Sequence, residues 1–142
     1  MAVGIVTLTH ESLGDKASRL LITGSATLDG TTPVTKDISL PIGYDHGRLS
    51  MFSASPAATV VTGKVLDKFS GVALSDVDTS GSGVDGVVGA VPDAVVAGAA
   101  VGVPMGDITL SFEASGADTS VWTFELELFG HAEGSGQRTE TQ

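Results

Sequence analysis

The chain has 142 residues, with 17 acidic and 7 basic side chains and a formal net charge of −10. Nucleic acid and anionic membrane surfaces are therefore unfavourable partners, because both require a basic face. Cysteine is absent, which excludes disulfides, thiolate metal ligands and a cysteine nucleophile.

The N-terminal stretch MAVGIVTLTHESLGDK lacks the basic start and the long apolar core of a signal peptide. Residues 3–9 alternate in the manner of a strand. We interpret residues 1–16 as an N-terminal arm or edge strand. A single β-domain is expected over residues 17–130, followed by a flexible C-terminal tail over 131–142, which is almost without apolar side chains.

The middle of the chain consists of short segments of period two, separated by Gly, Pro and Asp turn signals. The stretch DKFSG at 67–71 is short enough to join the strands on either side of it as a hairpin. The sequence PIGYDHG at 41–47 predicts a turn. The expected strands cover residues 19–28, 34–40, 48–52, 59–66 and 72–77.

The clearest alternation lies in DITLSFEA at 107–114 and SVWTFELELFG at 120–130, which are separated by a Gly-containing turn. We expect these two strands to pair as a hairpin whose apolar face forms a wall of the core. The predicted core residues are Ile108, Leu110, Phe112, Trp122, Phe124, Leu126 and Leu128.

The segment from Gly83 to Gly106 is apolar but almost without large side chains. It can form an ordinary inner strand pair around Pro92, or part of it can form an oligomer interface, since obligate interfaces are apolar. Both interpretations stay open. The interface candidates are Val87, Val88, Val95, Val96, Val101 and Val103.

The loop DVDTSGSGVDG at 76–86 begins like a calcium-binding loop, with Asp76, Asp78 and Ser80 at alternate positions. The twelfth position should be a bidentate Glu, but here it is Val87. Asp85 offers one further ligand to a loop-type cation site. The favoured interpretation is a polar tether between strands, and no metal or other cofactor is assigned.

The remaining polar residues form no catalytic motif in the sequence. Asp45 and His46 are neighbours, and neighbouring side chains of an extended segment point apart, so no dyad is expected. Glu125 and Glu127 share one strand face and favour solubility over catalysis. In the expected hairpin Glu125 lies opposite Glu113, where like charges repel. Enzymatic activity is therefore the least favoured class.

Several short strands with turn signals predict an all-β chain, folded as an antiparallel β-sandwich or small β-barrel with extended N- and C-terminal arms. An acidic, cysteine-free chain that is rich in Gly, Ala, Val and Thr resembles the head decoration, or cement, proteins of tailed bacteriophages. The resemblance is carried by the extended start MAVGIVTLTHESLGDK, the turn-rich middle and the closing strands GDITLSFEASGADTSVWTFELELFG.

This resemblance implies a structural virion protein on the capsid surface. Such a protein forms a homotrimer, binds the outside of an icosahedral shell, and stabilises it by bridging major capsid proteins through several modest contacts. The alternatives are a phage tail-tube or other virion subunit, and a β-sandwich module that binds carbohydrate or another ligand.

Overall fold

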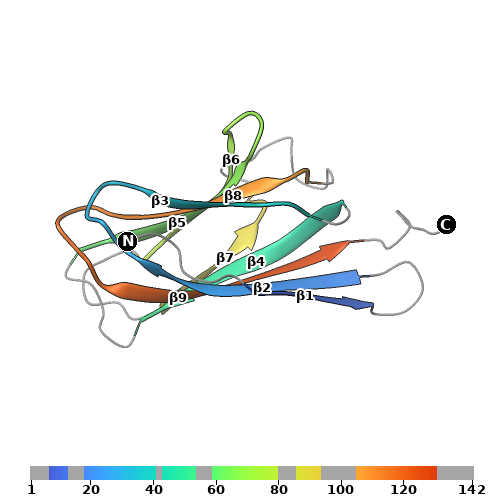
Figure 1. The fold of residues 1–142 in the computed structure, drawn as a ribbon, viewed down its shortest axis with the longest axis horizontal. Helices are drawn as coiled ribbons and strands as arrows, with labels where there is room; N and C mark the ends of the chain where they lie inside the picture. The colour runs from blue at the N-terminus through green and yellow to red at the C-terminus, as the bar shows by residue number, and fades with distance from the viewer. Residues whose placement is uncertain are drawn as a thin grey trace.

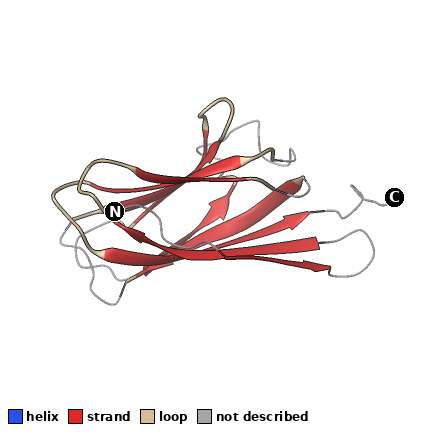
Figure 2. Ribbon diagram, in the orientation of Figure 1, coloured by secondary structure: helices blue, strands red, loops and turns tan. Residues whose placement is uncertain are grey.

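The computed structural model describes residues 7–12, 18–40, 43–53, 59–79, 86–93 and 105–130. Over these residues the chain forms two antiparallel sheets that lie face to face (Figures 1 and 2). The predicted β-sandwich is thus confirmed. The described part contains no helix, and so none that is long and apolar enough to cross a membrane.

The described residues form nine strands, which divide into a sheet of five, in the order β1-β2-β9-β4-β7, and a sheet of four, in the order β3-β8-β5-β6. Their bounds are β1 Thr7–Ser12, β2 Ser18–Thr27, β3 Val34–Ile38, β4 Tyr44–Phe52, β5 Val61–Asp67, β6 Ala73–Asp78, β7 Gly86–Val91, β8 Ile108–Ala114 and β9 Val121–Gly130.

The strand pairs are nested in the sequence. The hairpin β5–β6 lies at the centre, and β4–β7, β3–β8 and β2–β9 pair successively outside it. These nested pairs form a two-stranded ribbon that is rolled up, so that β9 also pairs with β4 and β8 also pairs with β5. Such a pattern of two sheets is that of a jelly roll. The hairpin predicted over residues 59–77 is confirmed as β5–β6.

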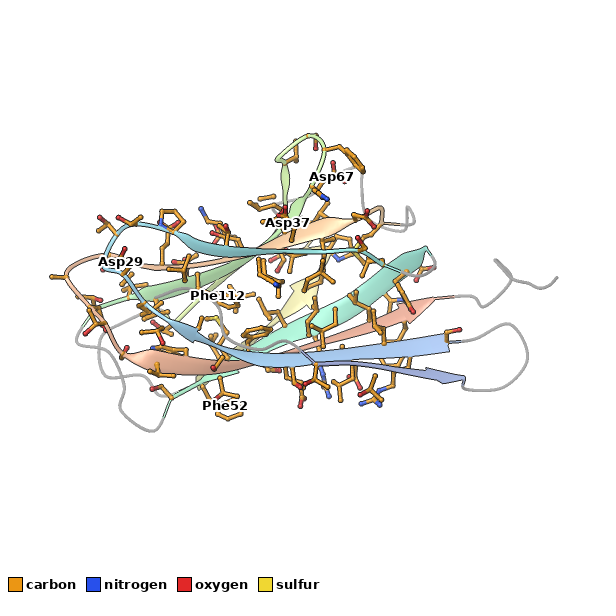
Figure 3. All side chains as sticks on the ribbon, viewed as in Figure 1. Asp29, Asp37, Phe52, Asp67 and Phe112 are labelled. Atoms are coloured by element: carbon orange, nitrogen blue, oxygen red, sulfur yellow. The ribbon has the colours of Figure 1, made fainter. Side chains whose placement is uncertain are left out.

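The core lies between the sheets and is filled by alternate residues of the strands. All seven residues predicted from β8 and β9 are buried there, and Trp122, Phe112 and Phe124 are among its largest side chains. The rings of Phe112 and Phe124 meet across the sandwich with centroids 4.9 Å apart, and Figure 3 shows Phe112 between the layers. Trp122 keeps its polar group satisfied, because Nε1 donates to Ser120 Oγ at 3.0 Å.

The predicted hairpin of residues 107–130 is wrong. β8 belongs to the four-stranded sheet and β9 to the five-stranded sheet. The connection between them crosses from one layer to the other. Backbone groups at its start and within it bond to Gly30, which lies between β2 and β3. Gly30 N–H donates to the Asp118 carbonyl at 2.8 Å, and Ala114 N–H donates to the Gly30 carbonyl at 3.0 Å.

This crossing also removes the repulsion expected between Glu113 and Glu125. Glu113 lies opposite Thr62 of β5. Glu125 lies in the other sheet, between Thr23 of β2 and Ser50 of β4. The two carboxylates therefore project from opposite sides of the sandwich.

The predicted turn at 41–47 is corrected as well, because β4 already begins at Tyr44. Its pairing with β9 shifts register between Tyr44 and His46. Gly47 follows this irregularity, and a Cβ at that position would lie only 1.9 Å from the Glu127 carbonyl oxygen. The close approach of β4 to β9 therefore requires glycine at position 47.

We expect Trp122→Ala to lower the free energy of unfolding by about 3–5 kcal/mol, because it empties the largest buried site of the core. The measurement is urea denaturation followed by circular dichroism. Val121→Ala is the matched control, since that neighbouring side chain is 52% exposed. Equal losses for the two variants would contradict this description of the core.

We expect Gly47→Ala to lower the free energy of unfolding by about 1–3 kcal/mol, because the new methyl group must push β4 away from β9. Gly106→Ala serves as the control, since nothing lies within 4 Å of a Cβ at that position. Thermal melting compares the two variants. An unchanged melting temperature in Gly47→Ala would show that the two strands are further apart than described.

Candidate functional site

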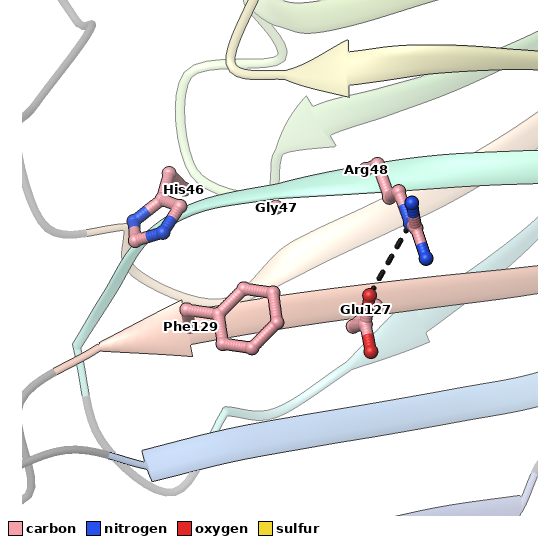
Figure 4. Close-up of a pocket in the computed structure, with 5 residues that line it drawn as sticks. All are labelled: His46, Gly47, Arg48, Glu127 and Phe129. Atoms are coloured by element: carbon pink, nitrogen blue, oxygen red, sulfur yellow. Dashed lines mark ion pairs between the residues drawn. The ribbon is translucent and has the colours of Figure 1, made fainter.

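The outer face of the five-stranded sheet carries a shallow hollow of about 340 Å³ between β4 and β9. Figure 4 shows the five residues that line it, with two charged side chains beside two rings. These residues are His46, Gly47, Arg48, Glu127 and Phe129. Because β4 and β9 are paired inside the sheet, the side chains of the hollow stand on a rigid base.

The charged side of the hollow is built around Glu127, whose side chain is only 14% exposed. Arg19 Nε on β2 donates to Glu127 Oε2 at 2.5 Å. Arg48 Nε on β4 lies 3.2 Å from Glu127 Oε1. Each carboxylate oxygen thus faces one guanidinium, and charge-assisted contacts of this kind hold a side chain in one orientation.

Sequence reasoning treated Glu127 as a solvated residue and missed this cluster. The available signal was that Arg19 and Arg48 both fall on predicted strands, in a chain with only 7 basic residues. That signal was insufficient, because Arg19 and Glu127 are 108 positions apart and only the sheet order brings them together.

The aromatic side of the hollow pairs His46 with Phe129, which are direct cross-strand partners. Their rings are nearly parallel at 21°, with centroids 5.4 Å apart. His46 Nδ1 also lies 2.6 Å from Asp45 Oδ1. The sequence predicted that Asp45 and His46 point apart, and this was wrong. The register shift after Tyr44 interrupts the alternation and allows the two side chains to meet.

A second kind of surface consists of exposed apolar side chains. Phe52, Val88 and Val121 are each more than half exposed on the outer side of the five-stranded sheet, and we call them the sheet patch. Figure 3 shows Phe52 on that side. Phe69 is 81% exposed and Val72 is 56% exposed, both in the turn between β5 and β6.

The β5–β6 turn is held in shape by its own hydrogen bonds. The Asp67 carboxylate accepts from Ser70 N–H at 2.9 Å and from Ser70 Oγ at 2.8 Å. Gly71 N–H donates to the Asp67 carbonyl at 2.8 Å, with Gly71 at a φ of 74°. The backbone N–H and the hydroxyl of Ser70 lower the pKa of the Asp67 carboxyl. Phe69 is therefore presented on an ordered turn.

The interface candidates fall into two groups. Val87 is partly buried against the core, whereas Val88 is exposed in the sheet patch. Among the described strands, their strand β7 stands at one end of the five-stranded sheet, where it pairs with β4. The other candidates, Val95, Val96, Val101 and Val103, lie outside the described residues.

The candidate cation loop is only partly described. Asp76 and Asp78 lie exposed on β6, and Asp78 Oδ1 accepts from Thr62 Oγ1 at 2.7 Å. Ser80 and Asp85 lie outside the described residues. Among the residues that are described, no group of three or more His, Asp and Glu side chains could hold a metal ion.

Although Asp76 is exposed, partial desolvation of its carboxyl group raises the pKa, and the negative charge of Asp78 raises it further. A raised pKa means that ionisation of Asp76 opposes folding. This free-energy cost is present at neutral pH and disappears as the pH falls below the ordinary pKa of 3.8.

Because of this cost, we expect Asp76→Asn to raise the melting temperature at pH 7 but not at pH 3. A lower melting temperature at pH 7 would contradict the assignment. Asp37→Asn on the exposed edge strand β3 is the control for charge alone.

Comparison with known proteins gives no family. No protein-family model and no curated protein matches the chain. Among solved structures, one described as "CBM4 structure and function" aligns with a TM-score of 0.41 and 10% identity, over 87% of this chain and 86% of the other. The structure of infectious bursal disease virus Gt strain aligns with a TM-score of 0.39 and 13% identity, over 92% of this chain but 34% of the other. CsCBM6-3 from Clostridium stercorarium in complex with cellobiose gives a TM-score of 0.30 and 14% identity, over 91% and 86% of the two chains. At such scores these likenesses assign no function.

Proposed function

We propose that this chain is a non-catalytic structural protein of a virion. In this role it binds the outside of an icosahedral phage capsid as a homotrimer and stabilises the shell by bridging neighbouring major capsid proteins. The observation that carries the proposal is the presence of exposed apolar side chains on opposite sides of one rigid sandwich.

The first anchor is Phe69. An exposed aromatic ring is a typical hot spot of protein interfaces, because it buries a large area with few rotatable bonds. The turn around it is already closed by Asp67 and Ser70, so little backbone entropy is lost when a partner covers the ring. Figure 1 shows this turn rising away from the four-stranded sheet.

The second anchor is the sheet patch of Phe52, Val88 and Val121. It lies on the outer side of the five-stranded sheet, so it faces away from the layer that carries the Phe69 turn (Figure 3). One copy can therefore contact two neighbours at once, which is what a bridging protein requires. Two modest contacts joined by a rigid body bind far more tightly than either alone.

The negative net charge of the chain favours a partner protein with a basic surface. The net charge of −10 supports solubility of the unbound chain and directs it towards basic surfaces. The trimer and the capsid location are proposed from the resemblance to decoration proteins, and the two exposed apolar surfaces support the proposal.

The test uses purified chain together with expanded and unexpanded shells built from the major capsid protein of the same genome. We expect light scattering to give the mass of a trimer and co-sedimentation to show binding to expanded shells only. Phe69→Ser should weaken this binding at least tenfold without changing the melting temperature. Lys68→Ala, in the same exposed turn, is the matched control and should bind normally.

A stable monomer that ignores both kinds of shell would overturn the proposal. Rings or long polymers in the absence of shells would replace it by a tail-tube role. Shell binding that is unchanged in Phe69→Ser would remove the turn as an anchor and leave the sheet patch to be tested by Phe52→Ser.

A further inference from the structure

We propose that the hollow between β4 and β9 is a binding site for a neutral saccharide. The site is distinct from the two apolar anchors and does not depend on the capsid role. Its residues place a hydrogen-bonding pair directly beside two aromatic rings, on the open outer face of the five-stranded sheet (Figure 4).

The hydrogen-bonding pair is Glu127 and Arg48. A sugar ring presents adjacent hydroxyl groups, each able to donate and to accept. Arg48 Nε and Glu127 Oε1 are 3.2 Å apart, so one hydroxyl can donate to the carboxylate while its neighbour accepts from the guanidinium. Charge-assisted hydrogen bonds of this kind are about twice as strong as neutral ones.

Arg19 gives this pair its fixed geometry. Its guanidinium holds the other carboxylate oxygen, Oε2, and turns Glu127 so that Oε1 faces Arg48. A ligand therefore meets an acceptor that is already oriented, in a side chain that is mostly removed from solvent. Arg19 thus supports Glu127 from the neighbouring strand β2.

The rings supply the apolar half of the site. One face of a pyranose is lined by C–H groups, and such a face packs against aromatic side chains by the same contacts that make aromatics good interface residues. Phe129 and His46 lie side by side with nearly parallel rings, and Figure 4 shows both next to the charged pair. A single sugar ring can thus stack on Phe129 and reach Glu127 with its edge.

The local charge favours a neutral sugar over an acidic one. Among the described side chains at the hollow, the guanidiniums of Arg19 and Arg48 lie with the carboxylates of Glu127 and Asp45. The whole chain carries a net charge of −10, which repels anionic ligands at long range. The hollow is also open, because the side chains of His46 and Arg48 are 69% and 62% exposed, and it therefore admits a unit within a longer glycan.

The test is an array of neutral glycans built from hexoses, N-acetylhexosamines and deoxyhexoses, together with sialylated forms of the same glycans. The best binder is then titrated into isotope-labelled chain by NMR. We expect saturable shifts of the backbone amides of His46, Arg48, Glu127 and Phe129. Phe129→Ala and Glu127→Gln should each weaken binding at least tenfold.

Two variants on the same sheet face serve as controls. Glu125→Gln makes the same change of charge as Glu127→Gln, two residues away on the same strand, and Phe52→Ala removes an exposed ring outside the hollow. Both should bind the glycan as the unaltered chain does, and melting curves verify that all four variants are folded.

The proposal is overturned if no neutral glycan on the array binds, or if the amide shifts map elsewhere. It is also overturned if the control variants weaken binding as much as the site variants do. Stronger binding of the sialylated forms would contradict the assignment of a neutral ligand. Shell binding by Phe129→Ala is expected to be normal, so failure here and failure of the capsid role are separately visible.

Discussion

The whole structure depends on the burial of one face of β8 and β9 between the two sheets. Phe112 and Phe124 belong to different sheets, and their rings meet at 4.9 Å in the centre of the core. Around this contact the inner residues of both strands are almost fully removed from water. Because a jelly roll pairs strands that are distant in sequence, this shared apolar layer is what makes the nested pairing favourable.

Burial of one face leaves the other face available, since side chains of a strand alternate between the two. On β9 the buried Phe124, Leu126 and Leu128 alternate with Glu125, Glu127 and Phe129. The residues of the hollow are therefore held by the same strand that builds the core. Their positions are as rigid as the sheet, which is the condition for a site that must orient a carboxylate against a guanidinium.

The proposed glycan site and the proposed capsid anchors differ in chemistry and lie at different places on the molecule. The hollow combines charges with rings on β4 and β9, whereas the anchors are apolar side chains at the sheet patch and at the β5–β6 turn. A rigid sandwich can present all of these at once, because none of them takes residues from the core. The proposed capsid role and the proposed glycan site are accordingly compatible in one chain.

The sequence by itself determined the all-β class, the inner faces of β8 and β9, and the β5–β6 hairpin, because alternation and a short turn are local properties. Only the tertiary structure decided that β8 and β9 lie in different sheets, since the choice between a hairpin and a crossing depends on bonds to Gly30 and other distant residues. It also decided that Asp45 meets His46, through a register shift that no spacing reveals. Above all, it decided the surroundings of Glu127. The polar alternation placed this residue outside the core, but its partners Arg19 and Arg48 come from β2 and β4, and only sheet order and register bring the three side chains together.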